Sequence, residues 1–267
     1  MNEAETKFKT MFVSTEETKA IWILTINNPP LNIITPVFFA EFEVVLKQYF
    51  QDREAKILII TGAGDRAFSM GADITEIASI DNAAQGRVLA KRGQDLYDQV
   101  ENSDKPIIAA INSMCFGGAN ELILACHLRI ASEKSKFAQS EINLGIIPGW
   151  GATQRLPRLI GTSRARKIIL TGDMITAQEA YDIGMIDEIV QHGEVLNRSM
   201  EIAKKIIRNS QFAVAYAQKA IREGMKKSLS EGIKIELDCF EQVCASEDMK
   251  EGIHAYINKR QPQYKNR

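Results

Sequence analysis

Residues 115–126 read CFGGANELILAC, and this stretch places one carboxylate among residues that are otherwise small or apolar. Its two glycines and the aliphatic run after them are typical of a buried turn that leads into a buried helix. Glu121 lies inside that run. A carboxylate buried without a partner costs several kcal/mol or keeps its proton. We therefore treat Glu121 as the first candidate functional residue.

The composition is that of an ordinary globular protein. The chain has 267 residues, of which 45% are hydrophobic and 25% are charged. This length allows one large domain, or one domain with an appendage. The formal net charge is −1, which gives no reason to expect binding to nucleic acid or to an anionic membrane surface. We predict neither partner.

Several further features favour a cytoplasmic protein. The first ten residues, MNEAETKFKT, lack the apolar core of a signal peptide, and no apolar run approaches the roughly 18–20 residues of a membrane span. The four cysteines form no CxxC pair, which favours reduced thiols. The three histidines are far apart in the sequence and indicate no metal site; they are His127, His192 and His254.

Strand and helix patterns alternate along most of the chain. Residues 9–26 predict a hairpin of two strands. Thr35 and Pro36 predict a helix start, with a hydroxyl N-cap and a proline at the first helical position. The run KILIITG at 56–62 predicts a strand that is buried on both faces. Because the alternation continues to about residue 190, we predict an α/β layer structure with parallel strands.

The last quarter of the chain has a different pattern. Beyond about residue 193 the strand patterns stop, and four segments show helical spacing with charged outer faces. We therefore predict two parts, an α/β core at 1–192 and a C-terminal helical module at 193–267, with no disordered linker between them.

One glycine motif suggests a nucleotide-binding oxidoreductase, but its context is wrong. ITGAGDRA at 60–67 follows a strand and fits the pattern G-x-G-x-x-A. In that fold a helix opens within the motif, and an acidic residue ends a second strand about 20 residues on. Here the chain continues into FSMGADITEI at 68–77, with a further glycine. A turn is the favoured interpretation.

Two glycine turns, one at Gly71 and one at Gly117 and Gly118, have the same sequence pattern. In each, a small or apolar run and a glycine precede a predicted helix start. A helix N-terminus presents unpaired N–H groups. Two such turns facing each other would form an oxyanion hole. The alternative interpretation is that Gly71, Gly117 and Gly118 only permit tight turns. Glu141 follows Glu121 by 20 residues. Two carboxylates near these turns indicate a general acid/base pair, although Glu141 alone would be read as a solvated side chain.

Taken in order, these segments resemble the crotonase superfamily, and most of all its enoyl-CoA hydratases. The resemblance covers nearly the whole chain. It implies a spiral of β-β-α turns, a C-terminal helical module that builds a trimer or a dimer of trimers, and a coenzyme A thioester substrate of fatty acid metabolism. The segments that carry it are FSMGADI (68–74), KPIIAAINSMCFGGANELILACHLRIAS (105–132), FAQSEINLGIIPGWGATQRLPRLIG (137–161), AQEAYDIGMIDEIV (177–190) and DMKEGIHAYINKRQP (248–262).

The resemblance also implies residue roles. The N–H groups of Ala72 and Gly118 would form the oxyanion hole for the thioester carbonyl. Glu121 would activate water for attack at C3 of an enoyl-CoA, and Glu141 would supply the proton to C2, giving a 3-hydroxyacyl-CoA. The N–H of Gly149 would help to hold the water. Both carboxylates are present, which favours hydration. No cofactor is expected, since coenzyme A is part of the substrate.

Substrate contacts are expected from two regions. Trp150 lies where the resemblance places the rim of the acyl pocket, although it could equally pack against the protein's own loops. Lys259, with Tyr256 one turn earlier, would reach coenzyme A across a subunit boundary. The other expected substrate-binding residues are Met70, Asp73 and Ile74.

Some positions depart from the family pattern and leave the acyl group open. The segment before Glu121 reads GGAN rather than GGG, Met70 stands where alanine is general, and the loop NNPPLNII at 27–34 lacks the usual basic residue. Three alternatives therefore remain beside linear enoyl-CoA hydration. They are a hydratase of a cyclic or unusual acyl-CoA, an enoyl-CoA isomerase, and a non-catalytic RNA-binding or scaffold protein.

Overall fold

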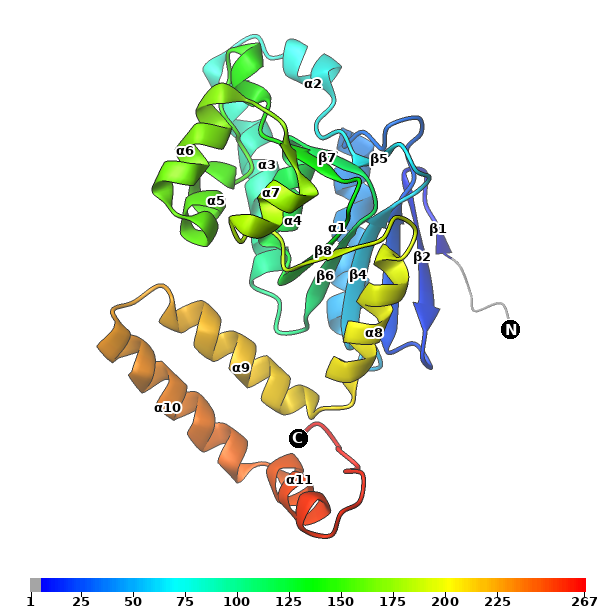
Figure 1. The fold of residues 1–267 in the computed structure, drawn as a ribbon, viewed down its shortest axis with the longest axis vertical. Coiled ribbons are helices and arrows are strands. Elements are labelled where there is room, and N and C mark those ends of the chain that lie inside the picture. Colours follow the sequence, from blue (N-terminus) through cyan, green and yellow to red (C-terminus); the bar gives the residue numbers. More distant parts are fainter. Residues whose placement is uncertain (1–5) are drawn as a thin grey trace.

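The core of the molecule is built from two sheets, because successive strands alternate between them (Figure 1). The computed structural model describes residues 6–267. The larger sheet contains, in spatial order, β1 (Thr6–Lys7), β2 (Met11–Glu16), β3 (Ile21–Ile26), β4 (Ile57–Gly62), β6 (Ile107–Ile111), β8 (Leu128–Ser132) and β11 (Glu188–Val190). The smaller sheet contains β10 (Ile175–Thr176), β9 (Lys136–Ala138), β7 (Met114–Phe116) and β5 (Ala67–Ser69).

The large sheet confirms the predicted hairpin and the predicted parallel strands. β2 and β3 pair antiparallel, with Glu16 opposite Ile21 at the turn. From β3 onward every pairing in this sheet is parallel. All six residues of β4 are buried, as its continuous apolar run predicted.

Helices join the strands and cover the sheets. They are α1 (Pro36–Gln51), α2 (Ile74–Ala78), α3 (Ala83–Glu101), α4 (Gly118–Ala125), the 3₁₀ helix η1 (Glu141–Leu144), α5 (Ala152–Ile160), α6 (Thr162–Thr171) and α7 (Ala177–Asp182). Thr35 caps α1 as predicted, because its side chain accepts a hydrogen bond of 3.2 Å from the N–H of Phe38.

The chain climbs as a spiral in which one strand of the large sheet is followed by one of the small sheet. β4 leads to β5, β6 to β7 and then α4, and β8 to β9 and then η1. The glycine motif at 60–67 forms the first of these links. Its turn is held by the side-chain amide of Asn32, which donates to the carbonyls of Ala63 (3.0 Å) and Ala67 (2.9 Å). No helix opens there, so the interpretation as a turn is confirmed.

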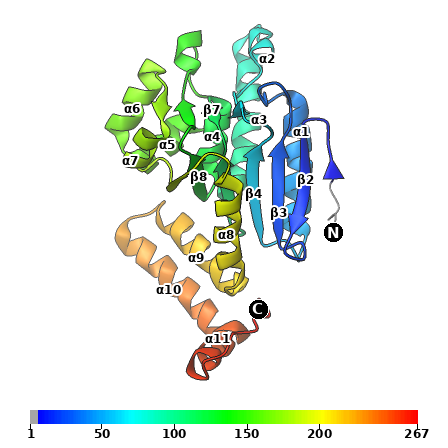
Figure 2. The same ribbon diagram turned by 45° about the vertical axis from the view of Figure 1, so that its right-hand side comes forward.

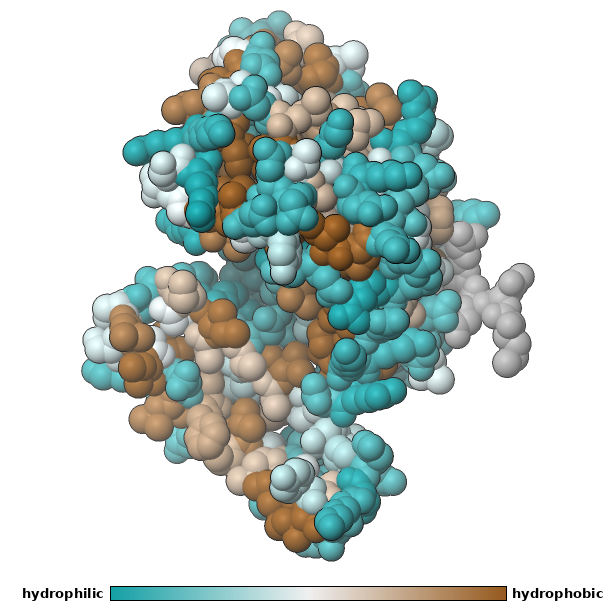
Figure 3. Space-filling model, viewed as in Figure 1, coloured by the Kyte–Doolittle hydropathy of each residue, from teal (hydrophilic) through white to brown (hydrophobic). Residues whose placement is uncertain are grey.

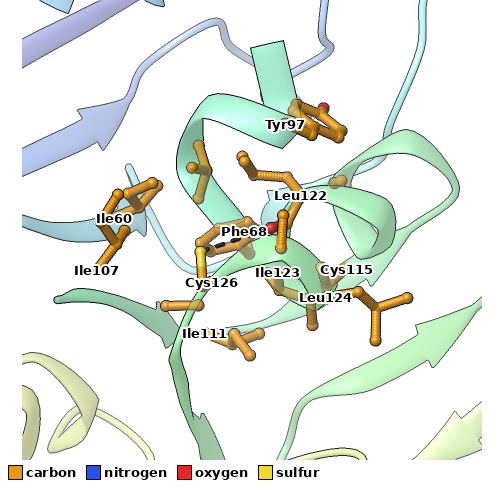
Figure 4. Packing of buried hydrophobic residues seen from close by; sticks show 14 of the residues in the cluster. Ile60, Phe68, Tyr97, Ile107, Ile111, Cys115, Leu122, Ile123, Leu124 and Cys126 are labelled. Atoms are coloured by element: carbon orange, nitrogen blue, oxygen red, sulfur yellow. Dashed lines mark hydrogen bonds between the residues drawn. The ribbon is translucent and has the colours of Figure 1, made fainter. Parts of the chain in front are cut away.

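Helix α4 lies at the centre of the core, and all eight of its residues are buried. Figure 4 shows Leu122 and Ile123 of this helix surrounded by core side chains, with Cys126 hydrogen-bonded to the carbonyl of Leu122. His127 then ties the helix to β6, because its Nδ1 accepts from the N–H of Ile107 at 2.9 Å. Burial lowers the pKa of His127 to about 4, so this ring stays neutral.

The C-terminal quarter is helical, as predicted. It consists of α8 (Val195–Ile207), α9 (Gln211–Gly224), α10 (Leu229–Ala245) and α11 (Glu247–Ile257). α8 packs on the large sheet, where Val195 and Ala203 meet Ile59, Ile108 and Ile130. By contrast, α9, α10 and α11 form an arm that extends from the core (Figure 2). The boundary between the two parts at residues 192 and 193 stays a prediction. It assigns α8, which packs on the large sheet, to the C-terminal module.

Among residues 6–267, no helix combines the length and the apolar character that a membrane crossing requires.

Candidate active site

The carboxylate of Glu121 is held by the start of another helix. Glu121 lies in the first turn of α4 and only 2% of its surface is exposed. Its Oε1 accepts hydrogen bonds from the N–H groups of Trp150 (2.8 Å) and Ala152 (2.9 Å), where α5 begins. Burial and the neighbouring carboxylate of Glu141 raise the pKa of Glu121 to about 8, while the two N–H donors oppose this shift. Oε1 of the buried Glu121 is therefore anchored to the start of α5.

Glu141 opens η1 and faces the same region. Its Oε2 is buried and has no hydrogen-bond partner among residues 6–267. Burial raises the pKa of Glu141 above its usual range. Two carboxylates whose charge is disfavoured, and which influence each other, share protons readily. This is the arrangement that proton transfer to a bound molecule requires.

The two glycine turns that the sequence singled out are in contact. Gly71 has a φ of +86° and Gly117 a φ of +52°, so both adopt a backbone region that favours glycine. A Cβ on Gly71 would lie 2.6 Å from the carbonyl oxygen of Phe116 and 3.0 Å from the nitrogen of Gly118. Only glycine at position 71 lets the two turns approach this closely. The residues that follow the two glycines, Ala72 and Gly118, reach one shared cavity.

That cavity has a volume of about 590 Å³ and brings together the five residues predicted as catalytic, oxyanion-hole or water-positioning groups. They are Ala72, Gly118, Glu121, Glu141 and Gly149. Apolar side chains form most of the remaining wall, and these are Ile77, Ile80, Leu89, Ala90, Ile146, Ile147, Pro148 and Trp150. Two carboxylates and two adjoining backbone turns thus meet in an apolar cavity that can accept an acyl group.

Trp150 lines the cavity and is also packed inside the protein. It is only 5% exposed, and its ring stands edge-on to Phe39, with centroids 4.9 Å apart, and to Tyr97, at 5.9 Å. The indole fills notches left by two glycines. A Cβ would lie 2.2 Å from the ring at Gly93 and 2.0 Å from it at Gly118. Trp150 therefore packs internally and also borders the cavity, and its expected place at the rim of an acyl pocket stays a prediction.

Comparisons with known proteins agree with this geometry. Residues 16–267 match the model of the family described as enoyl-CoA hydratase/isomerase. The chain belongs to this family. It is 37% identical over 254 residues to the short-chain-enoyl-CoA hydratase of Clostridium acetobutylicum, which covers 94% of this chain and 97% of the relative. It is likewise 37% identical to the crotonyl-CoA hydratase of Syntrophomonas wolfei, over 93% of this chain and 96% of that protein.

The fold comparison gives the same result. The crystal structure of an enoyl-CoA hydratase from Bacillus anthracis superposes with a TM-score of 0.93 at 36% identity, covering 97% of this chain and 100% of that one. The expected crotonase-type α/β fold with a helical C-terminal segment is confirmed, as is the expected kinship with the enoyl-CoA hydratases.

Several substrate-binding residues expected from the family resemblance lie outside the cavity. Met70, Asp73 and Ile74 are absent from its lining. The carboxylate of Asp73 instead caps α2 by accepting from the N–H of Thr75 at 2.9 Å. Their assigned role stays a prediction.

Tyr256 and Lys259 are on the arm. Tyr256 is 86% exposed and Lys259, just past α11, is also exposed. Figure 1 shows α11 at the end of the molecule opposite α2 and α3. Within one chain these two residues do not meet the cavity, which is compatible with their expected contact across a subunit boundary.

Two further residues, Gln94 and Arg155, support the candidate site, and no sequence pattern identified them. The side-chain amide of Gln94 donates to the carbonyl of Gly149 at 2.8 Å, which orients that peptide at the cavity edge. Arg155 donates to the carbonyl of Trp150 at 2.9 Å and pairs with Asp98 and Glu101 at the end of α3. Both side chains belong to ordinary amphipathic helix patterns, so only the fold reveals their partners.

The raised pKa of Glu121 predicts a pH-dependent change in stability. Folded Glu121 keeps its proton up to about pH 8, whereas an unfolded glutamate loses it near pH 4.5. Between these values the folded state binds more protons, so the free energy of unfolding falls as pH rises. Glu121→Gln removes this titration and can still accept from Trp150 and Ala152. The melting temperature of Glu121→Gln should therefore exceed that of the wild type increasingly from pH 5 to pH 8.

At pH 8 the difference should be at least several degrees. Each unit by which the folded and unfolded pKa values differ corresponds to about 1.4 kcal/mol. About 1 kcal/mol shifts the melting temperature by about 2–4 °C in a chain of this size. Calorimetry or circular dichroism at fixed protein concentration would measure it. A difference that stays constant with pH would show that Glu121 does not carry this titration.

Proposed function

We propose that this protein adds water reversibly across the 2,3 double bond of a 2-enoyl-CoA thioester to give a 3-hydroxyacyl-CoA. The observation that carries the proposal is the pair of buried carboxylates, Glu121 and Glu141, on one apolar cavity beside two glycine turns. Hydration needs one group to activate water and one to deliver a proton. The named relatives are hydratases of short enoyl-CoA esters, which supports the same reaction here.

The two carboxylates have different surroundings, which suits different roles. Glu121 accepts two N–H groups on Oε1, so its position is fixed and its other oxygen is directed to a water. Glu141 has a buried oxygen with no partner among residues 6–267, so this oxygen is free to contact a bound molecule, and its raised pKa keeps a proton available to donate. In the proposed reaction the ionised form of Glu121, whose population grows as pH approaches about 8, takes a proton from water as the oxygen attacks C3. Glu141 gives a proton to C2, and the pair is restored when Glu121 releases its proton and Glu141 regains one.

The glycine turns would stabilise the charge that develops during this step. As water adds to C3, electron density moves through the conjugated system onto the thioester oxygen. In the proposal this oxygen accepts hydrogen bonds from the N–H groups of Ala72 and Gly118. Such preorganised donors act strongly in an apolar cavity that excludes water. The reaction as proposed uses coenzyme A as part of the substrate, requires no separate cofactor, and takes place in the cytoplasm.

The position of Trp150 favours a short or flat acyl group. The indole occupies space beside Gly118 that a smaller residue would leave open. Beyond the cavity, Ile80 and Leu89 separate it from a second hollow of about 460 Å³. We propose that linear short-chain enoyl-CoA esters are the preferred substrates, and a panel of enoyl-CoA and 3-hydroxyacyl-CoA thioesters tests this together with the proposed reaction.

Trp150→Ala should widen the acyl specificity. One methylene in an apolar pocket is worth roughly 1–3 kcal/mol, so the ratio of kcat/KM between short and long esters should change by more than about tenfold. The measurement is kcat/KM for both proteins across a series of linear 2-enoyl-CoA esters. Profiles that differ only by a constant factor would mean that Trp150 has a purely structural role.

We further propose that the arm mediates assembly into a trimer or a dimer of trimers. Large hydrophobic side chains are exposed along it, and Figure 3 shows brown patches over this part of the surface. They are Ile221, Met225, Leu229, Ile233, Leu237, Phe240, Ile253 and Ile257. Contiguous apolar patches of this kind mark protein interfaces. Analytical ultracentrifugation would measure the assembly state.

Lys259→Ala should raise KM for the CoA thioester by several-fold and leave kcat nearly unchanged. Its ammonium group is proposed to contact coenzyme A bound to a neighbouring subunit, away from the reacting atoms. Loss of binding that is equal in the ground and transition states has this kinetic signature. Lys250→Ala in α11 is the matched control, since Lys250 is also exposed and lies near Lys259 in the sequence. Equal KM values for the two variants would remove Lys259 from the site.

A further inference from the structure

The hydroxyl of Tyr97 forms a hydrogen bond to the backbone of the candidate oxyanion hole. Tyr97 lies in α3 and is fully buried. Its hydroxyl donates to the carbonyl oxygen of Gly118 at 3.0 Å. Figure 4 shows its ring near Leu122, above α4. The residue is absent from the cavity lining, so it acts on the site only through Gly118.

Gly118 is the first residue of α4, so its orientation depends on the helix backbone and on the side chains that pack around it. Glycine has no side chain to anchor it, and its backbone has more conformational freedom than that of any other residue. The N-cap of α4 is Gly117, which supplies no side-chain cap. A hydrogen bond weakens steeply when its donor is misaligned, so an N–H used as an oxyanion donor must be held in direction.

Two side chains hold Gly118 in place, Tyr97 from outside the cavity and Trp150 from the cavity wall. The indole of Trp150 lies directly against the Cα of Gly118, where a Cβ would be only 2.0 Å from the ring. Tyr97 fixes the carbonyl on the other side of the same Cα. Tyr97 and Trp150 also pack on each other, with ring planes at 88°. The carbonyl and the Cα of Gly118 are therefore both constrained.

We propose that Tyr97 is a positioning residue for catalysis, because its hydroxyl and the indole of Trp150 together align the N–H of Gly118 with the thioester oxygen. The inference rests on the proposed function, and specifically on the oxyanion hole. Burial and the nearby Glu121 raise the pKa of Tyr97 well above its ordinary value, so the hydroxyl stays a donor throughout the working pH range.

The first test is Tyr97→Phe, which deletes only the hydroxyl. Misalignment of one oxyanion donor should lower kcat by about tenfold, less than the loss expected when a donor is removed, with KM changed less than about twofold. Tyr49→Phe is a matched control. Tyr49 is also fully buried and its hydroxyl donates to a backbone carbonyl, that of Pro106 at 3.2 Å, away from the cavity. It should show a similar loss of melting temperature and wild-type kcat.

The second test measures hydrogen bonding in the oxyanion hole directly, through the stretching frequency of a bound thioester carbonyl. Butanoyl-CoA labelled with ¹³C at the thioester carbonyl is unreactive, and hydrogen bonds to its oxygen lower the infrared stretching frequency. The bound ester should show a lowered frequency in the wild type and in Tyr49→Phe, and a frequency closer to that of the free ester in Tyr97→Phe. Replacing Tyr97 by 4-aminophenylalanine, which keeps a weaker donor at the same ring position, should give an intermediate frequency and an intermediate kcat.

The outcomes distinguish failure of the proposed oxyanion hole from failure of the proposed role of Tyr97. No frequency lowering in the wild type would overturn the oxyanion hole, and this inference with it. A lowered wild-type frequency that Tyr97→Phe retains, with kcat equal to that of Tyr49→Phe, would overturn the inference alone. If Tyr97→Phe does not fold, the 4-aminophenylalanine protein decides, because a wild-type frequency and kcat in that variant would contradict the proposal.

Discussion

Glu121→Gln and Glu141→Gln are each expected to lower kcat for hydration of a 2-enoyl-CoA by at least about 10²-fold, the usual scale for loss of a general acid or base. Both carboxylates line the cavity, and within residues 6–267 neither forms an ion pair with a cation. Glutamine has nearly the same volume and keeps the acceptor that Glu121 offers to the N–H of Trp150. The loss should therefore appear in kcat and leave the assembly state unchanged.

Steady-state kinetics and size-exclusion chromatography would measure both quantities. Glu133→Gln is a suitable control, because it removes an exposed carboxylate outside the cavity. If Glu121→Gln retains hydration within a few-fold of the wild type while Glu141→Gln does not, a mechanism with two carboxylates is wrong. A single carboxylate would then favour an isomerase that shifts the double bond, and assays with 3-enoyl-CoA esters would detect that activity.

Gly118→Ala should also lower kcat by about 10²-fold, because it disturbs an oxyanion donor and its support together. The new Cβ would lie 2.0 Å from the ring of Trp150. That ring cannot retreat, since Phe39, Tyr97 and Gly93 enclose it. Either the first turn of α4 moves, or Trp150 as a whole moves and carries its backbone N–H away from Glu121.

Gly93→Ala provides the control for packing alone. Its Cβ would lie 2.2 Å from the same indole, but on α3 and without contact to the backbone of Gly118. Overpacking of this kind costs about 1–3 kcal/mol, so both variants should melt at lower temperature. The loss of kcat should be much larger for Gly118→Ala. Similar losses in both would show that the clash with Trp150, and not the donor at Gly118, limits catalysis.

Local sequence patterns predicted the long elements of the fold but not its short ones. The run of β4 and the capped start of α1 carry strong signals, because they depend on burial and on cap chemistry within a few residues. The strands of the small sheet have two or three residues each, too few to show a period. They are strands only because the spiral places them side by side. The order of the segments, through the family resemblance, supplied the architecture that local patterns could not.

The residues of the candidate site also differ in whether the sequence alone could identify them. Glu121 could be found from sequence because a carboxylate in an apolar run is unusual. Glu141 could be assigned only together with Glu121 and the glycine turns. Gln94, Tyr97 and Arg155 gave no signal at all. Each sits on a helix with ordinary spacing, and its partner is a backbone carbonyl 55 residues away for Gln94, 21 for Tyr97 and five for Arg155.

The indole of Trp150, held between two glycines, also limits how this sequence can vary. Any side chain at position 93 or 118 would occupy the volume of the ring, so a tryptophan at 150 requires glycine at 93 as well as at 118. If position 150 becomes small, the requirement at 93 ends, while the backbone geometry at 118 still serves the reaction. Among related sequences, glycine at 93 should therefore covary with tryptophan at 150, and glycine at 118 should persist regardless of the residue at 150.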